Sequence, residues 1–108
     1  MQAITFRAAA AALGVCLLVP AVRPAAQNHR YLEAAEDAAR WVRAAGVRTE
    51  AGLTWPADPA DPKSVGTTLY SGSPGVVLFM LELHHATKDP AYLADARAGA
   101  DELVARLA

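Results

Sequence analysis

The side chain best placed for acid–base chemistry is Glu82, a lone carboxylate in the apolar run Val76–Leu83. Glycoside-processing enzymes use two carboxyl groups, up to about 10 Å apart, as acid and as base or nucleophile. Asp58 and Asp61 could supply the partner only if their proline-rich segment folds back over this run. The simpler interpretation pairs Glu82 with a base near the helix end, such as Lys88 or a histidine. We therefore assign no catalytic residue.

The histidines make a poor metal site. His84 and His85 are adjacent, so on a helix they point about 100° apart, and His29 is distant in sequence. Zinc needs three or four good ligands, and the single cysteine, Cys16, lies in the leading segment. We predict no metal ligand and no cofactor in this chain.

Gly72 and Gly75 form a turn motif in the segment Ser71-Gly72-Ser73-Pro74-Gly75. Glycine permits positive φ and close backbone approach at a sharp turn. The free amides of a helix N-terminus can also bind an anion. The segment lacks the lysine and spacing of a phosphate-binding loop, and it is not a Gly-x-Ser-x-Gly nucleophile elbow. A structural role is the favoured interpretation.

The aromatic residues suggest contact with a ligand. Trp41, Trp55 and the tyrosines could line a groove for a sugar or a peptide. Trp55 is the better candidate because it lies in a proline-rich segment, whereas Trp41 is expected to pack within a helix. Trp55 and Glu82 are thus the two possible ligand contacts.

Three helices are expected to position these residues, near 29–45, 74–87 and 90–107. In the first, apolar residues recur at steps of three and four, Glu36 is spaced to pair with Arg40, and Gly46 supplies a left-handed cap. Ser73 and Asp89 are the N-caps of the second and third helices, each followed by proline.

The second and third helices differ in kind. The second is apolar nearly all round and must be covered on several sides. The third is amphipathic. Its expected buried face comprises Leu93, Ala96, Ala100, Leu103 and Leu107, and its solvated face comprises Asp95, Arg97, Asp101 and Glu102. The first helix is amphipathic too, an alternation that suits a ring of outer and inner helices.

The segment from Val47 to Gly72 has no periodicity. The run Trp55–Pro62 contains three prolines, which exclude a helix or a central strand. Long ordered loops of this kind are often functional.

Residues 1–26 have the order of a secretory signal: a positive charge, the apolar run Ala8–Val19 and small residues before the exit. The run is too short to span a bilayer, which takes roughly 20 residues. An uncleaved anchor and a misassigned start are the alternatives. Cys16 is not preceded by the small residue that a lipoprotein signal favours. We expect an exported chain that is free of the membrane after cleavage.

The run Leu69–Leu83 resembles the loop-to-inner-helix repeat of lanthionine synthetase C-like proteins, in which a Gly-x-x-Gly turn enters an apolar inner helix. Ala86–Leu93 resembles the turn that follows, and Gly52–Pro56 resembles the approach segment. The resemblance implies an (α/α) toroid. In the full-length family it also implies a zinc ion, held by two cysteines and a histidine, that activates a thiol for thioether formation in a peptide substrate. No residue here matches those ligands.

The prediction is therefore an all-α chain: an N-terminal signal helix, then about one and a half hairpins of a partial toroid over 27–108. Its function would be that of a truncated lanthionine synthetase C-like protein, inactive alone. The alternatives are a small exported binding module that self-associates through its exposed inner helix, and a hairpin fragment of a six-hairpin glycosidase-like protein. A net charge of −1 gives no indication of a nucleic-acid partner.

Overall fold

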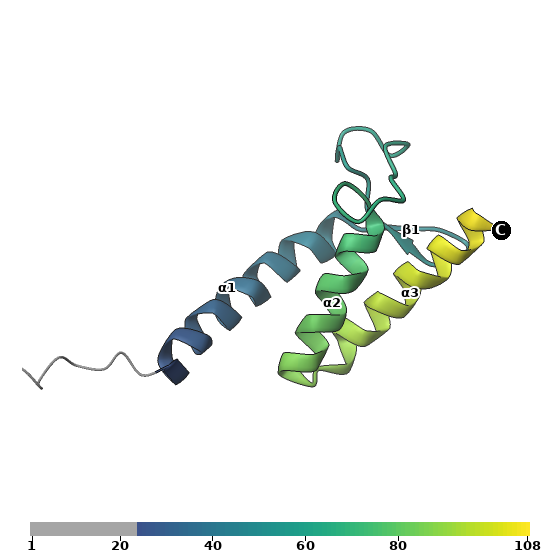
Figure 1. The fold of residues 1–108 in the computed structure, drawn as a ribbon. Coiled ribbons are helices and arrows are strands. Elements are labelled where there is room, and N and C mark those ends of the chain that lie inside the picture. The colour runs from purple at the N-terminus through teal and green to yellow at the C-terminus, as the bar shows by residue number, and fades with distance from the viewer. Residues whose placement is uncertain (1–23) are drawn as a thin grey trace, which may run out of the picture.

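The computed structural model describes residues 24–108, and it is mostly helical. The elements are α1 (Pro24–Ala45), β1 (Val47–Arg48), β2 (Leu53–Thr54), α2 (Ser73–Thr87) and α3 (Pro90–Leu107). The predicted signal segment lies outside the described residues, except that its last three residues begin α1. Helices α2 and α3 form an antiparallel hairpin, and α1 crosses beside it (Figure 1).

The core is small and lies where the three helices meet. Met80 and Leu83 of α2 pack with Ala39 of α1 and with Tyr92 and Ala96 of α3. Ala39 and Ala96 are small, so the helix axes can approach closely. Within residues 24–108, no helix is both long enough and apolar enough to span a bilayer.

Two expectations for α1 are wrong. Gly46 does not cap it in the left-handed region, because no described glycine has a positive φ. A Cβ at Gly46 would instead lie 3.1 Å from Trp55 Nε1, so this position keeps space for the indole ring. Arg40 pairs with Asp37, one turn earlier on the exposed surface, and not with Glu36.

The turn between α2 and α3 is closed by local hydrogen bonds. Lys88 adopts the left-handed conformation (φ 61°), and its N–H donates to the His84 carbonyl oxygen at 2.7 Å. The Asp89 carboxylate then accepts from the Ala91 N–H at 2.9 Å, which is the N-cap expected from the Asp-Pro pair. These contacts reverse the chain within a few residues.

The buried face of α3 is rotated from the predicted one. Tyr92, Ala96, Gly99 and Glu102 are buried, whereas Leu107 is 77% exposed. The expectation that Glu102 is solvated is wrong, because the segment that follows α1 covers it.

Glu102 is held in that buried position by one hydrogen bond and one ion pair. Its carboxylate accepts from the Thr49 hydroxyl at 2.9 Å and lies 2.7 Å from Arg106 Nε. Asp95, also expected to be solvated, forms an ion pair with Arg43 at 2.6 Å, and the Arg43 guanidinium lies 5.9 Å from the Tyr92 ring centre. A buried carboxylate such as that of Glu102 needs such partners to offset the loss of water.

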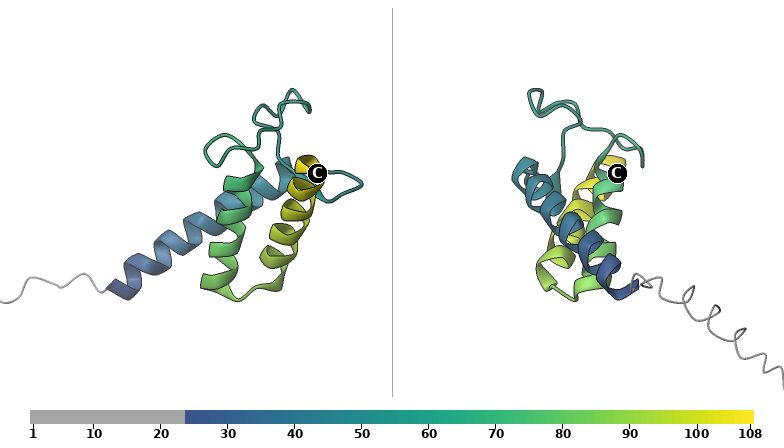
Figure 2. Two further views of the ribbon diagram at one scale, coloured as in Figure 1. Left: turned by 45° about the vertical axis from the view of Figure 1, so that its right-hand side comes forward. Right: turned by 90° about the vertical axis from the view of Figure 1, so that its left-hand side faces the viewer.

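The covering segment is a short antiparallel hairpin, whereas its lack of periodicity predicts an irregular loop. Val47 pairs with Thr54, and Arg48 pairs with Leu53. The turn is closed by the Thr49 N–H, which donates to the Gly52 carbonyl oxygen at 2.9 Å. The longer teal loop that follows β2 lies beyond the ends of the helices in both views of Figure 2.

Gly52 brings this hairpin into direct contact with α3. A Cβ at Gly52 would lie 2.0 Å from the Ala98 carbonyl oxygen, so a larger residue would force two backbones apart. We predict that Gly52→Ala lowers the free energy of unfolding by about 1–3 kcal/mol.

Urea unfolding followed by circular dichroism would measure this change. Glu50→Ala, at an exposed position of the same turn, is the matched control and should stay within about 0.5 kcal/mol of the parent. Equal midpoints for the parent and Gly52→Ala would contradict the close packing of hairpin and helix.

Candidate functional site

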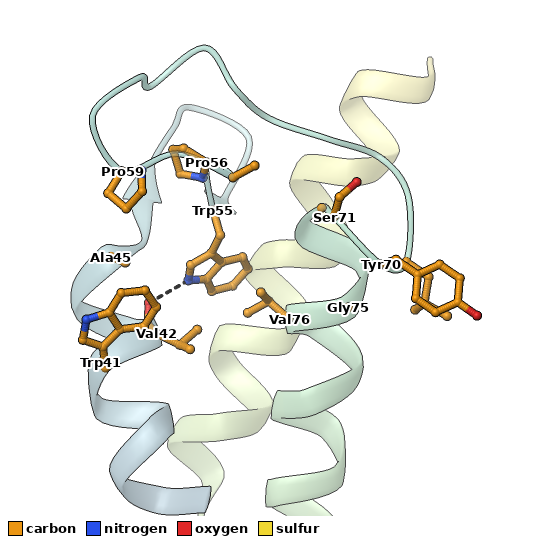
Figure 3. Close-up of a pocket in the computed structure, with 13 residues that line it drawn as sticks. Trp41, Val42, Ala45, Trp55, Pro56, Pro59, Tyr70, Ser71, Gly75 and Val76 are labelled. Carbon is orange, nitrogen blue, oxygen red and sulfur yellow. Dashed lines mark hydrogen bonds between the residues drawn. The ribbon is translucent and has the colours of Figure 1, made fainter.

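The candidate site is built around Trp55, which follows β2 directly. Its side chain is only 5% exposed. The indole Nε1–H donates to the Val42 carbonyl oxygen at 3.0 Å, the dashed line in Figure 3. On its other side the ring lies against α3, where a Cβ at Gly99 would be 2.9 Å from Trp55 Cζ3. One side chain therefore joins the end of α1 to the middle of α3.

Ser73 attaches the same residue to α2. The Trp55 backbone N–H donates to Ser73 Oγ at 3.0 Å, and the hydroxyls of Ser73 and Thr54 lie 3.0 Å apart. Ser73 is fully buried. The prediction that Ser73 is the N-cap of α2 is wrong: Gly72 occupies that position in an extended conformation, without a side-chain cap. The Ser73 hydroxyl therefore bonds to Thr54 and Trp55 and does not cap its own helix.

Gly72 and Gly75 act through close approach alone. A Cβ at Gly72 would lie 2.2 Å from the Gly66 carbonyl oxygen, and one at Gly75 would lie 2.3 Å from that of Leu69. Neither glycine has a positive φ, so the expected use of that conformation is wrong. The two residues let the loop 66–71 lie flat against the start of α2.

A cleft of about 450 Å³ opens between the end of α1, the proline loop and the start of α2. Trp41 stands on its α1 side, Trp55 forms its floor, and Pro56 and Pro59 lie above (Figure 3). Tyr70 stands at the far edge, and its ring points away from the cleft. Among the described residues, its lining comprises Trp41, Val42, Ala45, Trp55, Pro56, Ala57, Pro59, Leu69, Tyr70, Ser71, Gly72, Gly75 and Val76.

The two tryptophans take the opposite places from those expected. Trp41 is 68% exposed, so the prediction that it packs within the helices is wrong, while Trp55 is buried. Sequence could have indicated this exposure. Trp41 lies about 100° around the helix from Val42, off the apolar stripe.

The loop carboxylates are used locally. Asp58 accepts from the Ala60 N–H at 2.9 Å, and Asp61 accepts from the Lys63 N–H at 3.0 Å. Ser64 Oγ accepts from the Asp58 N–H at 2.8 Å and closes the loop. These contacts fold the proline segment on itself.

Glu82 lies elsewhere, at the rim of a groove between α1 and α2 with Tyr31 and Phe79 among its neighbours. The proline loop joins α2 at its first residue, Ser73, and Glu82 lies nine residues further along, about 14 Å along the helix axis. Glu82 therefore forms no catalytic dyad with the aspartates of that loop. The expected pairing of Glu82 with Lys88 or a histidine is absent among the described residues. His84 Nδ1 instead lies 2.9 Å from the Asp89 carbonyl oxygen.

The three histidines, all within residues 24–108, belong to no group that could hold a metal ion. His29 lies 3.3 Å from Glu33 on the exposed face of α1. Over residues 24–108, no three histidine, cysteine or acidic side chains are grouped so that they could hold a metal ion. In comparisons with known proteins, no family model, no curated protein and no solved structure matches this chain.

The attachment of Trp55 to α2 can be tested at Ser73. Ser73→Ala leaves the buried Trp55 N–H without its acceptor, and we expect it to lower the free energy of unfolding by about 1–3 kcal/mol. Ser71→Ala, two residues away at an exposed position, is the control. If urea unfolding shows equal losses for both variants, the Ser73 hydroxyl does not hold the two segments together.

Proposed function

We propose that this chain is a hairpin segment of an (α/α) toroid similar to lanthionine synthetase C-like proteins, and that it supplies scaffold and not a catalytic site. In this proposal α2 is an inner helix, with α1 and α3 as outer helices. Residues 1–26 direct export, and the complete ring binds the peptide substrate.

The observation that carries the proposal is the open side of α2. Helix α2 is packed by α3 and α1 on two sides, yet Leu78 is 48% exposed and Leu81 is 41% exposed on a third. Pro74, Leu78, Leu81 and His85 follow one another at helical spacing and form this stripe. In a ring, neighbouring inner helices cover such a stripe. The apolar character of α2 is therefore evidence in favour of a larger assembly.

The family's zinc site does not fit the described residues. Structural and catalytic zinc sites need at least three converging protein ligands, and residues 24–108 contain no such group. We therefore derive no chemical step through a metal for this segment.

A second candidate rests on the same stripe: an exported module that self-associates through Leu78 and Leu81. The two candidates differ in the expected cooperativity of unfolding. An isolated ring segment lacks the neighbouring helices that would cover α2, whereas a binding module completes its core with a defined number of copies.

We predict that the parent chain associates as its concentration rises, and that the double variant Leu78→Glu, Leu81→Glu stays monomeric. Charged side chains on the stripe cost desolvation energy in any interface. Sedimentation equilibrium would measure the change. Val104→Glu, at an apolar position of α3 that is 68% exposed, is the control and should associate like the parent.

Urea unfolding of the dilute monomer separates the candidates. A ring segment should unfold over a broad range, because few contacts cross its core. A sharp transition of the dilute monomer would contradict the ring segment. A single closed oligomer in sedimentation would favour the self-associating module.

A further inference from the structure

The cleft at the end of α1 is not used by the scaffold proposal. None of its lining residues belongs to the open stripe of α2, whose exposed leucines are Leu78 and Leu81. The two surfaces can therefore act independently.

The floor of this cleft is formed before any ligand arrives. Trp55 is fixed by the hydrogen bond to Val42 and by the one to Ser73, and Gly72 holds the loop against α2. Preformed sites bind with a smaller ordering cost. The volume of about 450 Å³ falls in the range of roughly 300–1,000 Å³ that is usual for ligand sites.

The chemistry of the lining selects against charged ligands and against sugars. Among residues 24–108, no charged and no amide side chain lines the cleft. A neutral ligand group therefore matches the cleft electrostatically. Both Trp55 donors already have acceptors, and the Ser71 hydroxyl lies 2.7 Å from that of Thr68. The lining offers a sugar few polar groups, chiefly the Trp41 indole N–H and the Tyr70 hydroxyl at the far edge, so most of the sugar hydroxyl groups would lose water without gaining a partner.

A proline-rich segment meets all of these conditions. Proline has no backbone N–H, so few donors are left unpaired on binding. Its rings present flat apolar surfaces, and a polyproline II helix is extended in advance at low entropic cost. Aromatic-lined grooves are the usual receptors for this conformation. Here Trp41 is 68% exposed, and it offers both a ring face and an indole N–H for a peptide carbonyl.

We propose that the cleft binds a neutral, proline-rich segment of a partner protein in the polyproline II conformation. One face of the peptide packs on Trp41, and its opposite side meets the start of α2 at Gly75 and Val76. Pro56 and Pro59 of the loop form the upper wall.

Isothermal titration calorimetry with acetyl-nonaproline-amide tests this site, at a protein concentration at which sedimentation shows a monomer. We expect saturable binding that becomes at least about tenfold weaker in Trp41→Ala, a change typical of losing an aromatic anchor. Tyr31→Ala is the control, because Tyr31 is also 68% exposed on α1 but does not line the cleft. It should bind like the parent.

Nuclear magnetic resonance of the parent chain gives a second readout that needs no variant. On addition of the peptide, the indole N–H signal of Trp41 should shift further than the amide signals of α3. No binding of nonaproline at millimolar concentration would overturn the proposal, as would equal binding by Trp41→Ala. Binding of cellohexaose in place of the peptide would also overturn it. The Leu78→Glu, Leu81→Glu variant should still bind the peptide, so this test does not depend on the scaffold proposal.

Discussion

The arrangement of the described chain depends on the fixed position of Trp55. Its ring fills the space between α1 and α3, its indole N–H is bound by the Val42 carbonyl, and its backbone N–H is bound by Ser73 of α2. Burial of a large aromatic side chain is worth several kcal/mol, which is much for a fold whose core contains only a few fully buried side chains. Both the cleft and the course of the proline loop follow from this position.

Positions without a side chain make that arrangement possible. Gly99 leaves room for the indole ring, Gly52 lets the hairpin contact α3, and Gly72 lets the loop contact the start of α2. Protein interiors are packed so closely that a single added carbon atom changes the stability of the fold. Scaffold and cleft therefore share a single set of close contacts, although the proposed partners of the two surfaces differ.

The three helices could be predicted from sequence because their apolar spacing and the Asp89-Pro90 start are local signals. The burial of the Glu102 side chain could not be predicted, because it depends on Thr49, a residue 53 positions earlier in the chain. The role of Ser73 depends on a distant residue for a similar reason. Serine before proline is typical of an N-cap, and only the folded chain brings Trp55 within reach of the Ser73 hydroxyl. The aromatic residues indicate a groove for a ligand, and the structure places Trp41 and Trp55 beside one cleft in which the exposed tryptophan is Trp41. That a ligand binds there stays a prediction. The toroid and its family remain proposals, because they concern helices that would surround α2.

The most direct test of the central role of Trp55 is hydrogen exchange of the two indole N–H groups, followed by nuclear magnetic resonance of the parent chain. Bound and buried N–H groups exchange only when the structure opens. We predict that the Trp55 indole N–H is protected and that of Trp41 exchanges at the rate of an exposed group. Equally fast exchange at both positions would contradict the account, because Trp55 would then not join α1 to the rest of the fold.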